Sequence, residues 1–138
     1  MLFRSRGAER AVSSLDDRAL DRLRELDAEL RASPDDAAKL LDLDLELHAG
    51  VYLAPTSRLR LLIQTHRNAV RPYMMSTGLV VERRRQADAE HAGILEALAR
   101  RDAAAASEAA AAHVHGEGRA LVERLNDLRA GEQSGLSS

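Results

Sequence analysis

The stretch that decides the fold is EHAGILEALARRDAAAASEAAAAHV, at residues 90–114. Its first part carries apolar residues at the 3.6-residue spacing of a helix. Asp102 then provides a capping side chain for a second helix. The alanine runs at 103–106 and 109–112 have high helix propensity, and their small side chains allow neighbouring helices to approach closely. The stretch therefore predicts two packed helices joined by a capped turn.

The helical pattern continues towards both ends of the chain. Aromatic residues make up only 2% of the sequence, and Ala, Leu, Arg, Asp and Glu dominate it, which favours helices over strands. Ser14 is expected to cap the first helix and Ser33 the second, and Gly78 is expected to separate the third from the fourth. We predict helices over about residues 15–32, 34–52, 59–74, 80–100 and 103–128. The fold class expected is all-α, an antiparallel bundle of about five to six helices.

The length and hydrophobic content suit a single domain. The chain has 138 residues, 45% of them hydrophobic, enough for one core. We place this domain at residues 14–130, after a flexible or remnant segment at 1–13 and before a disordered tail at 131–138.

Composition and charge exclude several classes of function. The chain has no cysteine, so any metal must bind through histidine and carboxylate groups. The net charge is only -2, with acidic and basic residues interleaved, so we expect no direct contact with nucleic acid. No apolar run reaches the roughly 20 residues that span a bilayer, and no signal peptide is evident. The sequence predicts a soluble cytoplasmic protein.

Four polar residues fall in the apolar stripes of three predicted helices. Asp44 and His48 are four residues apart, which places both on one face of the second helix. His91 lies in the stripe of the fourth helix and His113 in that of the fifth. Buried polar groups are costly unless they are paired. A shared divalent cation would satisfy all four, whereas the alternative is a set of ordinary hydrogen-bonded core histidines.

The donor set restricts the metal without naming it. Three imidazole nitrogens and one carboxylate oxygen suit several divalent transition metals. We expect one such ion, with Zn²⁺ first and Ni²⁺, Mn²⁺, Co²⁺ or Fe²⁺ as alternatives. His115 lies roughly 200° around the helix from His113 and cannot join the same site.

Residues 43–125 resemble the FadR C-terminal domain (FCD) of GntR-family transcriptional regulators. The resemblance rests on Asp44 and His48, on the Glu90–His91 pair, on Arg101–Asp102, and on the 22-residue step from His91 to His113. It implies that Asp44, His48, His91 and His113 hold the metal and that a small carboxylate effector completes its coordination. It also implies a homodimer.

Three further residues are candidates for binding the effector. Arg67 and Arg71 lie one turn apart on the third predicted helix and can hold an anion by charge-assisted hydrogen bonds, although a solvated arginine face is an equal alternative for Arg67. His66 lies on the apolar stripe of that helix, where it either lines the pocket or is a core histidine.

The function expected is that of a metal-dependent sensor of small carboxylates. The winged helix that reads DNA in this family has no counterpart before Leu15, so the chain is a fragment, a truncated paralogue or a stand-alone domain. One alternative is a metal-dependent lyase, hydratase or isomerase with His66 or Glu90 as the base. A second alternative is a helical dimerisation or interaction module without a ligand.

Overall fold

The computed structural model describes residues 15–51 and 57–136, and within these ranges it contains six helices and no strand. This confirms the expected all-α bundle. The helices are α2 (Asp17–Ala32), α3 (Ala37–Val51), α4 (Ser57–Ser76), α5 (Leu79–Glu82), α6 (Arg84–Ala99) and α7 (Ala103–Leu136).

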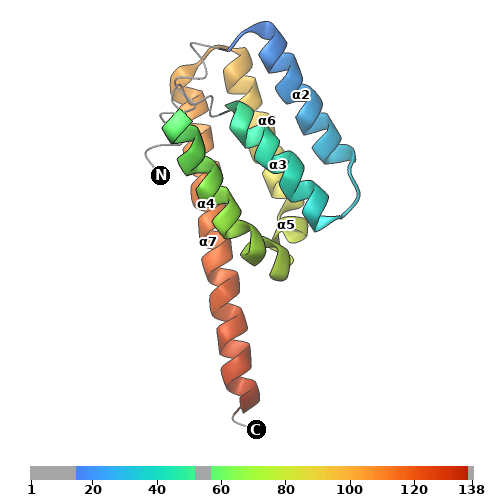
Figure 1. The fold of residues 1–138 in the computed structure, drawn as a ribbon, viewed down its shortest axis with the longest axis vertical. Helices are drawn as coiled ribbons and strands as arrows, with labels where there is room; N and C mark the ends of the chain where they lie inside the picture. The colour runs from blue at the N-terminus through green and yellow to red at the C-terminus, as the bar shows by residue number, and fades with distance from the viewer. Residues whose placement is uncertain (1–14, 52–56, 137–138) are drawn as a thin grey trace.

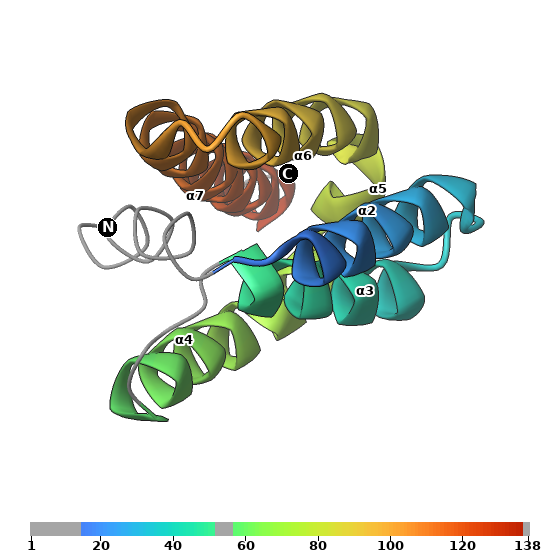
Figure 2. The ribbon, with the colours of Figure 1, turned by 90° about the horizontal axis from the view of Figure 1, so that it is seen from above.

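Two helical hairpins form the body of the bundle. Helices α2 and α3 form one hairpin and α6 and α7 the other, and α2 packs against α6 (Figures 1 and 2). Helix α4 lies along the outside of α3, and the short α5 leads from α4 into α6. The core of the bundle is therefore bordered by α2, α3, α6 and α7, which include the three helices expected to carry polar groups inward.

The core is built from leucines on one side and alanines on the other. Leucines of α2 and α3 meet Ile94, Leu95 and Leu98 of α6, while Ala106 and Ala110 of α7 are fully buried. The alanines allow α7 to lie close to α6.

A glycine allows a similar close approach between α2 and α3. A Cβ atom added to Gly50 would lie 2.4 Å from Cδ2 of Leu23, too close for any larger residue without movement. Gly50 therefore sets how near the two helices of this hairpin can come.

The first two helices begin later than expected, each after an aspartate. Asp16 caps α2, and its Oδ1 accepts a hydrogen bond from the Ala19 amide at 2.7 Å. Asp36 precedes α3 and accepts from the Ala38 amide at 3.1 Å. The expected cap at the second helix, Ser33, instead donates its hydroxyl to the Glu29 carbonyl at 2.8 Å and so closes the end of α2. Ser14, the expected cap of the first helix, lies outside the described residues.

The predicted helix over 80–100 is divided in two. Gly78 precedes α5 with a left-handed φ of 68°, which glycine adopts without strain. Arg83 then interrupts the helix with φ -84° and ψ 0°, and α6 begins at the next residue. This break turns Arg83 inward, where it is only 9% exposed.

Helix α7 is longer than predicted. It continues to Leu136, past the expected end near residue 128, so residues 131–136 are helical rather than disordered. Its last part runs beyond the other helices (Figure 1). Val122 and Leu128 of this helix are exposed. Within the described part of the chain, no helix is long and apolar enough to cross a membrane.

Candidate metal centre

The bundle brings together the four residues that the sequence singled out. Asp44 and His48 lie one turn apart on α3, His91 lies on α6, and His113 lies on α7. All four are buried, and each offers a ligand atom within 4.8 Å of those of the other three.

The distances between these atoms suit a small cation. Asp44 Oδ1 lies 3.3 Å from Nε2 of His48 and 3.3 Å from Nε2 of His91. The Nε2 atoms of His48 and His113 are 3.2 Å apart. Tetrahedral coordination with bonds of about 2.0–2.1 Å separates neighbouring ligand atoms by about 3.3 Å. The donor set and its spacing therefore fit a divalent transition metal.

Hydrogen bonding alone leaves this cluster incomplete. The two facing Nε2 atoms of His48 and His113 can share only one proton. Both ring nitrogens of His91 are buried without a hydrogen bond of acceptable geometry. An unpartnered buried polar group costs about 1–3 kcal/mol. A cation bound at the Nε2 atoms would supply the missing interaction.

The surrounding charges hold two of the four residues in the protonation states that metals bind. Burial disfavours the charged form of Asp44, but His48 and the Arg67 guanidinium outweigh it and hold the pKa of the carboxyl well below its usual value. Burial, followed by the positive charge of Arg67, lowers the pKa of His48 to about 4. At neutral pH Asp44 is thus an anion and His48 a neutral imidazole, the forms that bind metals.

A carboxylate from α6 orients His113. Glu90 Oε2 lies 2.5 Å from His113 Nδ1, which directs Nε2 of the same ring towards the centre of the cluster. The Arg83 guanidinium holds the other oxygen of Glu90 at 3.3 Å. Carboxylates in this outer position fix the tautomer and orientation of metal-bound histidines. Glu90, which the sequence suggested as a base, is thus already engaged in orienting His113.

Gly116 lies next to the contact between Arg83 and Glu90. A Cβ atom at Gly116 would lie 3.3 Å from Arg83 Nη2 and 3.6 Å from Glu90 Oε1. Neither Arg83 nor Gly116 stands at a ligand spacing, so their positions beside Glu90 were not predictable from the sequence.

A second carboxylate acts on His91 from α2. The pKa of His91 is raised above its usual value. Burial opposes this rise, but the carboxylates of Asp44, Glu117 and Asp27 all favour it and outweigh burial. Asp27 Oδ1 is buried without a hydrogen-bond partner, as is Nδ1 of His91. The other oxygen of Asp27 accepts a hydrogen bond from Arg31 at 3.0 Å.

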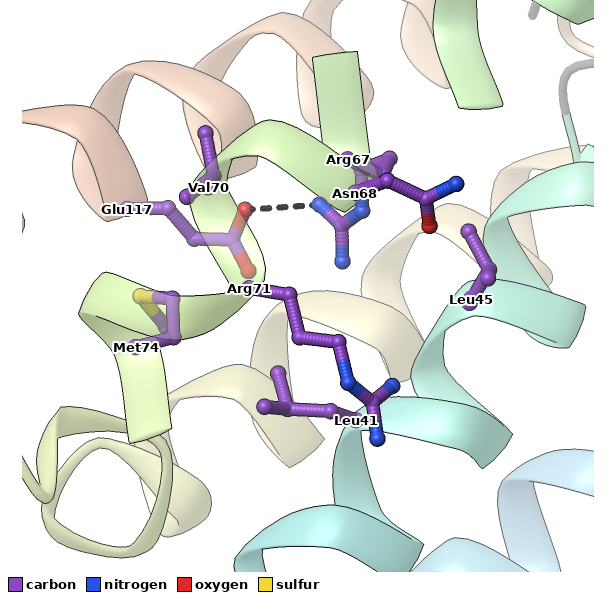
Figure 3. A pocket seen from close by; sticks show the side chains of 8 residues that line it. All are labelled: Leu41, Leu45, Arg67, Asn68, Val70, Arg71, Met74 and Glu117. Atoms are coloured by element: carbon purple, nitrogen blue, oxygen red, sulfur yellow. Dashed lines mark hydrogen bonds and ion pairs between the residues drawn. The ribbon is translucent and has the colours of Figure 1, made fainter. Parts of the chain in front are cut away.

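The two predicted arginines of α4 line a cleft beside the centre. The cleft has a volume of about 400 Å³, part of it open to solvent, and its walls come from α3, α4 and Glu117 of α7 (Figure 3). Arg67 is only 12% exposed and bonds to Asp44 and Glu117, so it does not belong to a solvated arginine face. Arg71 lies nearer the surface and donates to Asp42 at 2.6 Å. The side chain of His66 lies outside the described residues.

A second cavity of about 440 Å³ borders the centre on its α6 side. It reaches Asp44 and His91, and apolar side chains such as Leu40 and Val80 form much of its wall. Glu117 lines both cavities. Its position four residues after His113 places it on the same face of α7, a signal that was visible in the sequence, whereas its bond to Arg67 depends on how α4 and α7 are placed.

The fold and this cluster define a helical domain with a buried histidine and carboxylate centre beside a cleft lined by arginines. The chain matches the FCD domain family over residues 4–116 and belongs to it. Membership places it among the effector-binding domains of GntR-family regulators. No curated protein and no solved structure gives a significant match to the chain.

Proposed function

We propose that this protein is a metal-dependent sensor of small carboxylates. Asp44, His48, His91 and His113 hold one divalent transition metal, with Zn²⁺ preferred over Ni²⁺, Mn²⁺, Co²⁺ or Fe²⁺. The observation that carries the proposal is the convergence of three imidazoles and one carboxylate in the core: their ligand atoms all lie within 4.8 Å of one another, and three of the pairs are 3.2–3.3 Å apart. The bound metal supplies a Lewis-acidic position for an anion.

The charges around the centre favour an anionic effector. Asp44, Glu90 and Glu117 carry three negative charges, and Arg67 and Arg83 carry two positive ones. With neutral imidazoles the centre has one net negative charge, and a divalent cation changes this to one net positive charge. A carboxylate then neutralises the centre, whereas a neutral ligand of the same size does not.

The cleft of α4 supplies the remaining contacts of the effector. Arg67 bonds to Asp44 of the centre. Arg71 lies one turn further along the same wall of the cleft (Figure 3). Guanidinium groups bind carboxylates through paired, charge-assisted hydrogen bonds. We therefore assign the effector to small carboxylates whose second polar group reaches Arg71.

Metal analysis of the purified protein tests the proposal. We expect about one equivalent of transition metal in the wild type, loss of the metal in an Asp44→Ala, His91→Ala double variant, and a lower melting temperature after chelation. His115→Ala is the matched control, because His115 is exposed on α7 only two residues beyond His113. Metal-free wild-type protein that gains no stability from added Zn²⁺ would refute the proposal.

Ligand binding and turnover separate a sensor from an enzyme. We expect calorimetry with the zinc-loaded protein to detect binding of small hydroxy acids and dicarboxylates without their conversion. Turnover of these compounds would instead support the metal-dependent lyase, hydratase or isomerase. The homodimer that belongs to this proposal is tested by light scattering during gel filtration.

A further inference from the structure

Glu117 makes two contacts that a bound carboxylate would make. It lies one helical turn after His113 on α7, and its Oε1 is 3.5 Å from Nε2 of His113, the nitrogen that faces the centre. Its Oε2 accepts a hydrogen bond from Nη1 of Arg67 at 3.1 Å (Figure 3). One oxygen thus faces the centre while the other is held by the arginine of the cleft.

This carboxylate is also well shielded from water. The Glu117 side chain is 17% exposed, and it borders both cavities next to the centre. Burial opposes its ionisation, but the Arg67 guanidinium outweighs this effect and lowers the pKa of Glu117 below its usual value. Glu117 is therefore an anion at neutral pH, placed between the cleft and the centre.

Arg67 contacts two carboxylates at the same time. It bonds to Asp44, one of the four candidate ligands, and to Glu117. The bond to Asp44 belongs to the centre itself. The bond to Glu117 instead occupies an N–H donor of Arg67 that an incoming carboxylate needs.

We propose that Glu117 is an internal competitor that occupies the effector's carboxylate position, so that a carboxylate effector binds by displacing it from Arg67. This inference rests on the proposed metal-dependent function and adds to it how the affinity of the site is set. When an internal group occupies a site, the apparent affinity for a ligand falls in proportion to the fraction of time that the site is free. Removing the competitor must then increase the affinity for a simple carboxylate.

Two substitutions distinguish occupation of the site from a general effect of charge. Glu117→Gln removes the negative charge, and Glu117→Asp keeps the charge on a side chain one methylene shorter. Glu123→Gln is the matched control, since Glu123 is exposed on the same helix. Each protein is loaded with Zn²⁺, its zinc content is measured, and acetate is then titrated by calorimetry.

We expect all four proteins to hold zinc, with acetate binding about tenfold or more tighter in both Glu117 variants and unchanged in the control. Tightening in Glu117→Gln alone would overturn the inference, because charge and not occupation would then be the cause. Unchanged acetate affinity in zinc-loaded variants would also overturn it, as would loss of zinc from folded Glu117→Gln, which would make Glu117 a required ligand. Absence of zinc from the wild type would refute the proposed function itself, and this outcome is seen before acetate is added.

Discussion

Replacing Glu90 by glutamine tests how the bundle supports its candidate metal centre. The variant keeps the shape of the side chain but removes the charge that lies 2.5 Å from His113 Nδ1. Loss of such an outer carboxylate typically weakens metal binding 10- to 100-fold, which corresponds to about 1.4–2.8 kcal/mol. Because Arg83 also loses its anionic partner, we expect a loss of zinc affinity near the upper end of this range.

Competition with a chelator of known zinc affinity provides the assay, with circular dichroism as a check on folding. Glu96→Gln is the matched control: Glu96 lies on the same helix but is exposed and pairs with Arg100. We expect Glu96→Gln to bind zinc as the wild type does. A zinc affinity of Glu90→Gln within about twofold of the wild type would refute the view that this carboxylate orients His113 for the metal.

Three further predictions concern stability. Because the pKa of His48 falls from 6.5 to about 4 on folding, the unfolded chain binds this proton more readily, and His48 should make the metal-free protein less stable as the pH falls from about 6.5 to 4. The raised pKa of His91 acts in the opposite direction, so the test compares urea unfolding of the wild type and His48→Gln in the presence of chelator. The wild type should lose more stability over this pH range than the variant, and equal slopes would contradict the prediction. Gly50→Ala should destabilise the protein by about 1–3 kcal/mol in thermal unfolding, because the Cβ atom of the new alanine would overlap Leu23. An unchanged melting temperature would contradict the close packing of α2 and α3. Asp102→Ala should lower the stability by about 1 kcal/mol, because it removes the carboxylate that accepts a hydrogen bond from the Ala105 amide at 3.0 Å. Asp102→Asn should retain most of the stability, and equal losses in both variants would argue against the cap.

The first residue of α6, Arg84, ties this helix to the end of α2. Arg84 donates to the carbonyls of Leu30 and Arg31 at 2.8 and 3.0 Å, and so satisfies backbone groups at the end of α2. The Leu30 carbonyl also accepts from the Ser33 amide at 3.4 Å, so Arg84 adds a second donor to the last turn of α2, where carbonyls lack the usual helical partners. The break at Arg83 thus places two successive arginines in different roles, one against Glu90 and one against the end of α2.

The sequence by itself determined the helical class and the four residues that meet in the core. Both follow from local geometry, because the apolar period of a helix defines its buried face, and residues such as Asp44 and His48, four positions apart, share that face. The cap at Asp102 was predictable for the same reason. The starts of α2 and α3 were not, because several neighbouring residues can cap a helix and only their packed geometry selects Asp16 and Asp36.

The tertiary structure alone decided which groups surround the centre. Arg67 of α4 joins Glu117 of α7 to Asp44 of α3, and Arg83 holds Glu90 against His113. Each of these contacts joins side chains across different helices or across the break before α6. Their distances depend on how the helices are shifted and rotated against one another, and the periodicity of a single helix carries no information about that placement.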